Sequence, residues 1–164
     1  MKKRFTLSII LLIMTVFTGC KDEDQEPHKK KSKPSKNFSA KIDGVLFEED
    51  AVYSKNVGNN TYYEIFAFNT NHNGKDVSFS ISFFGDTLGK YIFWDPNSAK
   101  CDAYYGEDAT IDTGTFVAVS GSIKVTKIDS VNKTVSGIFN FLANDFQGHS
   151  RNITEGTFRD VPVM

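Results

Sequence analysis

The 164-residue sequence has only two cysteines, Cys20 and Cys101. Two cysteines cannot form a disulfide framework or a cysteine-rich metal cluster. The sequence also has only three histidines, and no two of them have the spacing of metal ligands on one element. These shortages argue against a disulfide scaffold and against a zinc protein. We expect Cys101 to be a small, half-buried apolar residue.

Local catalytic signatures are missing as well. The sequence contains no Walker loop, no HExxH, no GxSxG and no dinucleotide-binding fingerprint. We therefore expect a protein that is not an enzyme and that has no cofactor. The alternative is a small hydrolase whose acidic residues meet only in the folded chain.

Long apolar runs are missing except at the start of the chain, where residues 5–17 read FTLSIILLIMTVF. A helix that crosses a bilayer needs about 20 apolar residues, so this run is too short. It follows Lys2, Lys3 and Arg4, and a positive start before a short apolar run is typical of a secretory signal peptide. We predict that residues 1–19 are a cleaved signal and take no part in the fold.

The tetrapeptide FTGC, residues 17–20, spans the end of the predicted signal. This tetrapeptide resembles the lipobox of bacterial lipoproteins, with Phe17 where that family usually has Leu. The resemblance implies cleavage between Gly19 and Cys20 and transfer of a lipid to the Cys20 thiol. Two or three acyl chains hold a protein stably on a membrane, whereas one chain binds only marginally. The membrane is thus the first expected partner, reached through acyl chains on Cys20.

An acidic run follows Cys20 directly and consists of Lys21, Asp22, Glu23 and Asp24. It is similar to the lysine-plus-acidic tag with which Bacteroidota lipoproteins are exported to the outer face of the outer membrane. The resemblance predicts an outer-membrane lipid anchor with the domain facing the cell surface. The alternative is a solvated tether with the domain facing the periplasm.

Residues 20–37 contain no aliphatic or aromatic residue after Cys20. Such a segment cannot bury enough apolar surface to offset the entropy of ordering it. We predict a charged, flexible tether between the anchor and a single domain of residues 38–164.

The domain is acidic. Nine of the 19 basic residues but only four of the 20 acidic residues precede Phe38, which leaves the domain with a net charge of about −6. A protein that binds nucleic acid normally shows a basic face, so nucleic acid is not expected as a partner. We expect the domain to be monomeric.

Apolar and polar residues alternate throughout the domain, with no helical periodicity. In DVSFSISFF, residues 76–84, Val77, Phe79, Ile81 and Phe83 share one face and serines occupy the other, the pattern of a half-buried antiparallel strand. Turn residues separate such runs, and Asp43-Gly44 is predicted to make a hairpin turn. We predict strands at about 38–43, 45–53, 61–69, 76–84, 89–94, 102–105, 114–120, 121–129 and 134–142, and a pair or bend at 150–161. Nine to ten short strands favour an antiparallel β-sandwich, with a calycin-like β-barrel as the alternative.

Three segments together resemble an uncharacterised lipoprotein family of Bacteroidota. They read FSAKIDGVLFEED (38–50), VTKIDSVNKTVSGIFNF (125–141) and ITEGTFRDV (153–161). The family typically shows an opening FxAxIDGxxF, a late VSGTFSF hairpin and a closing GTF. The resemblance implies no known activity, so no catalytic residue is carried over.

The segment 91–112 combines aromatic and acidic residues. Exposed aromatic rings can stack on sugars, which makes a ligand rim of Trp94, Tyr104 and Tyr105 one hypothesis. Clustered carboxylates can hold calcium, which makes a site of Asp102, Glu107, Asp108 and Asp112 another. In the third interpretation the aromatic residues are core and the acids are solvated.

Two tripeptides, at 86–88 and 129–131, resemble the acceptor for O-glycosylation in Bacteroidota and place Thr87 and Ser130 as candidate sites. The anchor, the tether and the missing catalytic motifs together favour a non-catalytic binding or accessory module for an extracellular glycan or protein. A structural component of the envelope is the main alternative.

Overall fold

A computed structural model describes residues 36–58, 61–95, 100–108 and 114–164, all of which belong to one compact unit, Pro34–Met164. The predicted signal, the lipidation site Cys20, the tag Lys21–Asp24 and the candidate calcium ligand Asp112 lie outside the described residues. Within the described ranges, no helix is long and apolar enough to cross a membrane.

The domain consists of antiparallel β-strands, as the alternating sequence predicts. The ten strands are β1 (Phe38–Ile42), β2 (Val45–Glu49), β3 (Ala51–Asn56), β4 (Tyr62–His72), β5 (Lys75–Phe84), β6 (Gly89–Ile92), β7 (Cys101–Glu107), β8 (Thr115–Asp129), β9 (Thr134–Asn144) and β10 (Ser150–Pro162). They form one sheet in the order β2-β1-β10-β9-β8-β7-β5-β4-β3, with β6 paired to β8 outside this path.

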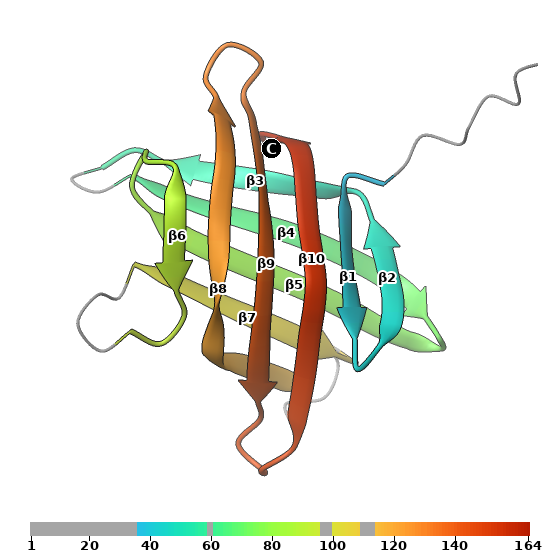
Figure 1. Ribbon diagram of the computed structural model, residues 1–164. Helices are drawn as coiled ribbons and strands as arrows, with labels where there is room; N and C mark the ends of the chain where they lie inside the picture. Colours follow the sequence, from blue (N-terminus) through green and yellow to red (C-terminus); the bar gives the residue numbers. More distant parts are fainter. Residues whose placement is uncertain (1–35, 59–60, 96–99, 109–113) are drawn as a thin grey trace, which may run out of the picture. The chain divides into compact units, whose positions relative to one another are not determined.

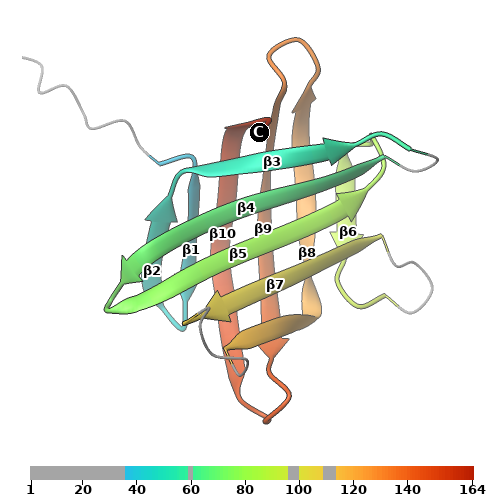
Figure 2. The same ribbon diagram turned by 180° about the vertical axis from the view of Figure 1, so that it is seen from behind.

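The sheet folds over on itself into two layers. Strands β6, β8, β9, β10, β1 and β2 form one layer, and β3, β4, β5 and β7 cross behind it at a steep angle (Figures 1 and 2). The chain end nearly closes the sheet, because Val163 forms a parallel bridge with Tyr53 and the Met164 N–H donates to the Tyr53 carbonyl at 2.8 Å. The fold therefore has the two packed layers of an orthogonal sandwich and the near-closure of a barrel.

Aromatic residues fill the space between the layers. Phe79 of the rear layer lies 5.3 Å from Phe38 and 5.2 Å from Phe47 of the front layer, measured between ring centroids. Tyr63 and Phe83 stack at 4.8 Å. All five side chains are buried. Burial of a phenylalanine contributes about 1.5–3 kcal/mol, so these rings are a main source of the stability of the domain.

The predicted turn at Asp43-Gly44 is confirmed. Ile42 and Val45 are paired, and the two residues between them have φ values of 48° and 86°. Two successive residues in the left-handed backbone region form a hairpin turn whose twist matches that of the flanking strands. This hairpin brings Asp43 beside β10, where its carboxylate accepts the Asn152 backbone N–H at 2.9 Å.

The strand prediction at 45–53 was wrong in its boundaries. This strand ends at Glu49, and a new strand starts at Ala51. Here the Asn37 side chain accepts the Ala51 N–H at 2.6 Å and donates to the Ala51 carbonyl at 3.0 Å, which holds the corner between the layers.

The strands expected at 114–120 and 121–129 form one strand, β8. Gly121 has a φ of 118°, a conformation open mainly to glycine, so the strand bends there and continues instead of ending. The segment at 150–161 is likewise a single strand, β10, with two irregularities in its pairing to β9.

Candidate functional site

The aromatic residues of segment 91–112 do not form one rim. Tyr105 is only 2% exposed, and its ring packs 5.2 Å from Phe79, so the expectation that it lies at a ligand rim was wrong. Neighbouring residues of a strand point to opposite faces, and Tyr104 is accordingly exposed. Trp94 is 69% exposed in the turn after β6, with a φ of 57°.

Two of the acidic residues of this segment, Asp102 and Glu107, lie far apart. Asp102 is exposed near the start of β7, and Glu107 is the last residue of the same strand. At roughly 3.3 Å per residue they lie about 16 Å apart along the strand. In the part of the chain that the structure describes, no group of three or more acidic, histidine or cysteine side chains could hold a metal ion. Asp108 follows Glu107 in the left-handed region, with a φ of 50°.

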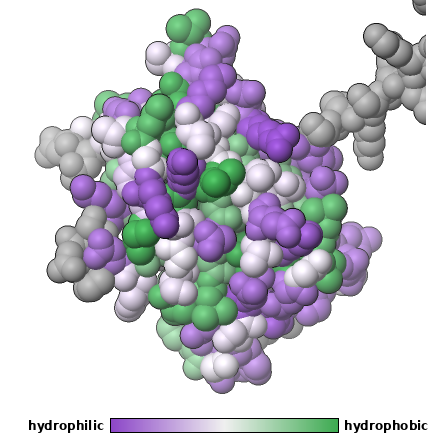
Figure 3. All heavy atoms as spheres, viewed as in Figure 1, coloured by the Kyte–Doolittle hydropathy of each residue, from purple (hydrophilic) through white to green (hydrophobic). Residues whose placement is uncertain are grey.

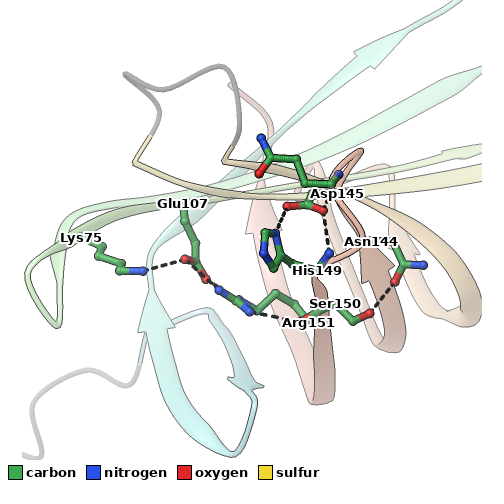
Figure 4. A network of polar contacts seen from close by, with 8 residues as sticks. Lys75, Glu107, Asn144, Asp145, His149, Ser150 and Arg151 are labelled. Carbon is green, nitrogen blue, oxygen red and sulfur yellow. Dashed lines mark hydrogen bonds and ion pairs between the residues drawn. The ribbon is translucent and has the colours of Figure 1, made fainter.

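Glu107 instead forms the centre of a polar network at one end of the domain (Figure 4). The Arg151 guanidinium donates to both of its carboxylate oxygens, from Nε at 2.6 Å and from Nη2 at 3.2 Å. Lys75 Nζ donates to Oε2 at 2.8 Å, and the Tyr105 hydroxyl donates to Oε1 at 2.9 Å. Two-point contact between guanidinium and carboxylate is the strongest common geometry for such a pair.

The network fixes the charge of Glu107. Hydrogen bonds from Arg151 are the largest influence, and with those from Lys75 and Tyr105 they outweigh partial burial and lower the pKa of Glu107 from 4.5 to about 2. Burial next to the same carboxylate raises the pKa of Tyr105. Glu107 is thus a carboxylate at neutral pH with its oxygens already occupied, which makes it unsuited to proton transfer.

The same network ties four segments together. Arg151 comes from β10, Glu107 from β7 and Lys75 from β5, and Arg151 Nε also lies 3.7 Å from Asp43 in the β1–β2 turn. The guanidinium carbon lies 4.9 Å from the centre of the Phe116 ring. No local pattern pointed to Arg151 or Lys75, because their partner Glu107 is 44 and 32 residues away along the chain.

A histidine–aspartate pair lies next to this network, in the β9–β10 connection (Figure 4). His149 Nδ1 lies 2.6 Å from Asp145 Oδ2, and Asp145 Oδ1 accepts the backbone N–H groups of Gln147 and His149. Desolvation works to raise the pKa of Asp145, but the hydrogen bonds from His149 and the backbone outweigh it and lower that pKa. The pair and the Glu107 network border a shallow hollow of about 260 Å³.

The pair has the geometry of a turn rather than of a catalytic dyad. A nucleophile would have to hydrogen-bond to the histidine. Among the described residues, no hydroxyl or thiol does so, and the nearby Ser150 hydroxyl donates to Asn144 at 3.0 Å. The Asp145 carboxylate organises the turn by holding its backbone N–H groups.

The two candidate glycosylation residues are exposed, Thr87 between β5 and β6 and Ser130 between β8 and β9. The aspartates that precede them have structural contacts. Backbone and side-chain hydrogen bonds from Asn132 lower the pKa of Asp129 to about 2. Asp86 accepts hydrogen bonds from Tyr63, Thr61 and Lys55.

Cys101 is fully buried, more deeply than we expected from the sequence. Burial is the largest cause that raises the pKa of its thiol to about 12, with the nearby carboxylates of Asp102 and Asp95 adding to the effect. A thiol in this state is protonated at neutral pH and therefore unreactive.

Comparison with known proteins identifies a family but no function. Neither a curated protein nor a solved structure matches the chain. The model of a family described as a domain of unknown function, DUF6252, matches residues 35–162. This range begins just before β1 and ends with β10, so it covers the whole β domain. The chain therefore belongs to the DUF6252 family.

Proposed function

We propose that this protein is a lipid-anchored lipoprotein of the Bacteroidota type, displayed on the cell surface, whose β domain is a non-catalytic binding module. The observation that carries the proposal is the order of segments. An apolar run lies just before Cys20, a charged stretch without apolar residues follows it, and the family domain begins at residue 35. This order is the one expected of a lipid anchor, a tether and a folded domain.

The side-chain contacts support a module that binds rather than reacts. Glu107 is neutralised by Arg151 and Lys75, and Asp145 is occupied by its own turn. These two carboxylates thus stabilise the fold. A structural envelope component fits the same anchor and tether, and it would differ by needing no ligand.

Lipidation at Cys20 is testable in cells that express the full-length chain. Labelling with radioactive palmitate is expected to mark the wild type, and Cys20→Ala is expected to abolish the label, because only the Cys20 thiol lies directly after the predicted signal. Cys101→Ala is the matched control and should keep the label, since Cys101 is buried in the domain. An unlabelled wild type, or a labelled Cys20→Ala variant, would contradict the anchor.

A further inference from the structure

A broad hollow of about 590 Å³ lies on the outer face of the front layer, away from the Glu107 network. Its lining comes from four neighbouring strands, β6, β8, β9 and β10, at a point where β10 has a bulge and Glu155 has a φ of 51°. The volume falls within the range of ligand sites, about 300–1,000 Å³. In Figure 3, which shows this face, strongly hydrophilic side chains and single apolar ones lie side by side over these strands.

Two lysines stand directly opposite each other at one side of the hollow. Lys90 of β6 and Lys124 of β8 are cross-strand partners, and both are exposed. Like charges in this position destabilise a sheet. Within the described residues neither ammonium group has an ion pair or a hydrogen bond, although the domain as a whole is acidic.

The rest of the hollow offers a hydrogen-bond donor and an apolar surface, and its one carboxylate is paired. Glu155, the one acidic residue of the lining, is held by Lys41 at 2.7 Å. Asn140 Oδ1 accepts the Ser122 hydroxyl at 3.4 Å, and among the described residues its Nδ2 has no partner. Ile138 lies beside Lys124 as its partner on β9 and is half exposed.

We propose that this hollow binds an acidic oligosaccharide, with Lys90 and Lys124 contacting its anionic groups. Carboxylates of uronic acids and sulfate esters share this chemistry. Asn140 Nδ2 would donate to sugar hydroxyls, and Ile138 would contact the apolar face of a ring. Two lysines on an acidic domain are too few for a nucleic-acid backbone, which needs an extended basic face.

Binding is measured by fluorescence anisotropy on the full-length chain in detergent, with labelled oligogalacturonate, dextran sulfate, neutral dextran and single-stranded DNA. We expect binding to one or both acidic glycans that weakens with salt. Lys90→Gln with Lys124→Gln should weaken it at least tenfold, because hydrogen bonds to charged groups are lost. Tighter binding of oligogalacturonate would identify carboxylates as the anionic groups that the lysines contact. Tighter binding of dextran sulfate would identify sulfate esters.

Lys100→Gln with Lys133→Gln is the matched control, since it removes two exposed lysines outside the hollow and should leave affinity unchanged. Lys124→Glu separates binding from folding. It should abolish binding while slightly raising the unfolding temperature, because it creates an opposite-charge pair with Lys90. The proposal would be overturned if neither acidic glycan bound, if neutral dextran bound equally well, or if single-stranded DNA bound more tightly. It would also be overturned if the control variant lost as much affinity as the Lys90 and Lys124 variant. The anchor is tested separately by the palmitate label.

Discussion

Gly121→Ala is expected to destabilise the domain by about 3 kcal/mol or more. Gly121 has a φ of 118°, where a residue with a side chain is strained by about 1–3 kcal/mol. An added Cβ would also lie 2.2 Å from the Asn140 carbonyl oxygen and 2.6 Å from the Phe141 Cα, both in the backbone of β9. Overpacking of this kind costs about 1–3 kcal/mol more. The change is measured as the free energy of unfolding in urea.

Gly74→Ala is the control for this prediction. Gly74 also has a positive φ, of 82°, but no atom lies within 4 Å of a Cβ placed there. Only the backbone strain remains, and it costs about 1–2 kcal/mol. Equal effects of the two substitutions would show that contact between β8 and β9 at the bend is not the reason for glycine at position 121.

Glu107→Gln is expected to destabilise the domain by about 2–3 kcal/mol at pH 7. The pKa of Glu107 is about 2 in the folded protein against 4.5 ordinarily, so the folded state favours the carboxylate. The stabilisation is complete above pH 4.5 and is lost as the pH falls toward 2. The difference between wild type and variant should therefore disappear over this interval, which denaturant titrations at a series of pH values would show.

Glu155→Gln provides the comparison for Glu107. Glu155 forms an ion pair with Lys41 at 2.7 Å, but its side chain is 67% exposed. An exposed pair contributes only about 0–1 kcal/mol. If Glu155→Gln were as destabilising as Glu107→Gln, or if the effect of Glu107→Gln persisted at pH 2, the central role of the Glu107 network would be wrong.

Local patterns in the sequence were sufficient to predict several strands and turns. The alternation at 76–84 gives β5 within one residue, and Asp43-Gly44 gives the first hairpin. Both features depend on neighbouring residues only, since the side-chain period of a strand and the φ preferences of turn residues are local properties.

Features that depend on distant residues could not be predicted in this way. The two layers are joined because β8 bends at Gly121 and continues, whereas a glycine between two alternating runs reads equally well as a turn. The near-closure depends on contact between Tyr53 and Met164. Similarly, Glu107 was one candidate calcium ligand because acidic residues lie near it in the chain, but its partner in space is Arg151.

The rim prediction failed for Tyr105 for a simpler reason. Tyr104 and Tyr105 are consecutive in β7, and a strand sends consecutive side chains to opposite faces. Only one of the two side chains could therefore lie on the exposed face of β7. Tyr105 points into the core, and its hydroxyl donates to Glu107.

Protease treatment of intact cells tests the proposed surface display most directly. Trypsin is added to cells that express the full-length chain or a variant with Lys21–Asp24 replaced by alanine, and a periplasmic protein is followed as the control for intact envelopes. Lysines at 29–31 provide cleavage sites in both chains. We predict that the wild-type domain is released and that the variant is protected. Protection of both chains would place the domain in the periplasm, and release of both would show that the acidic run is not the export signal.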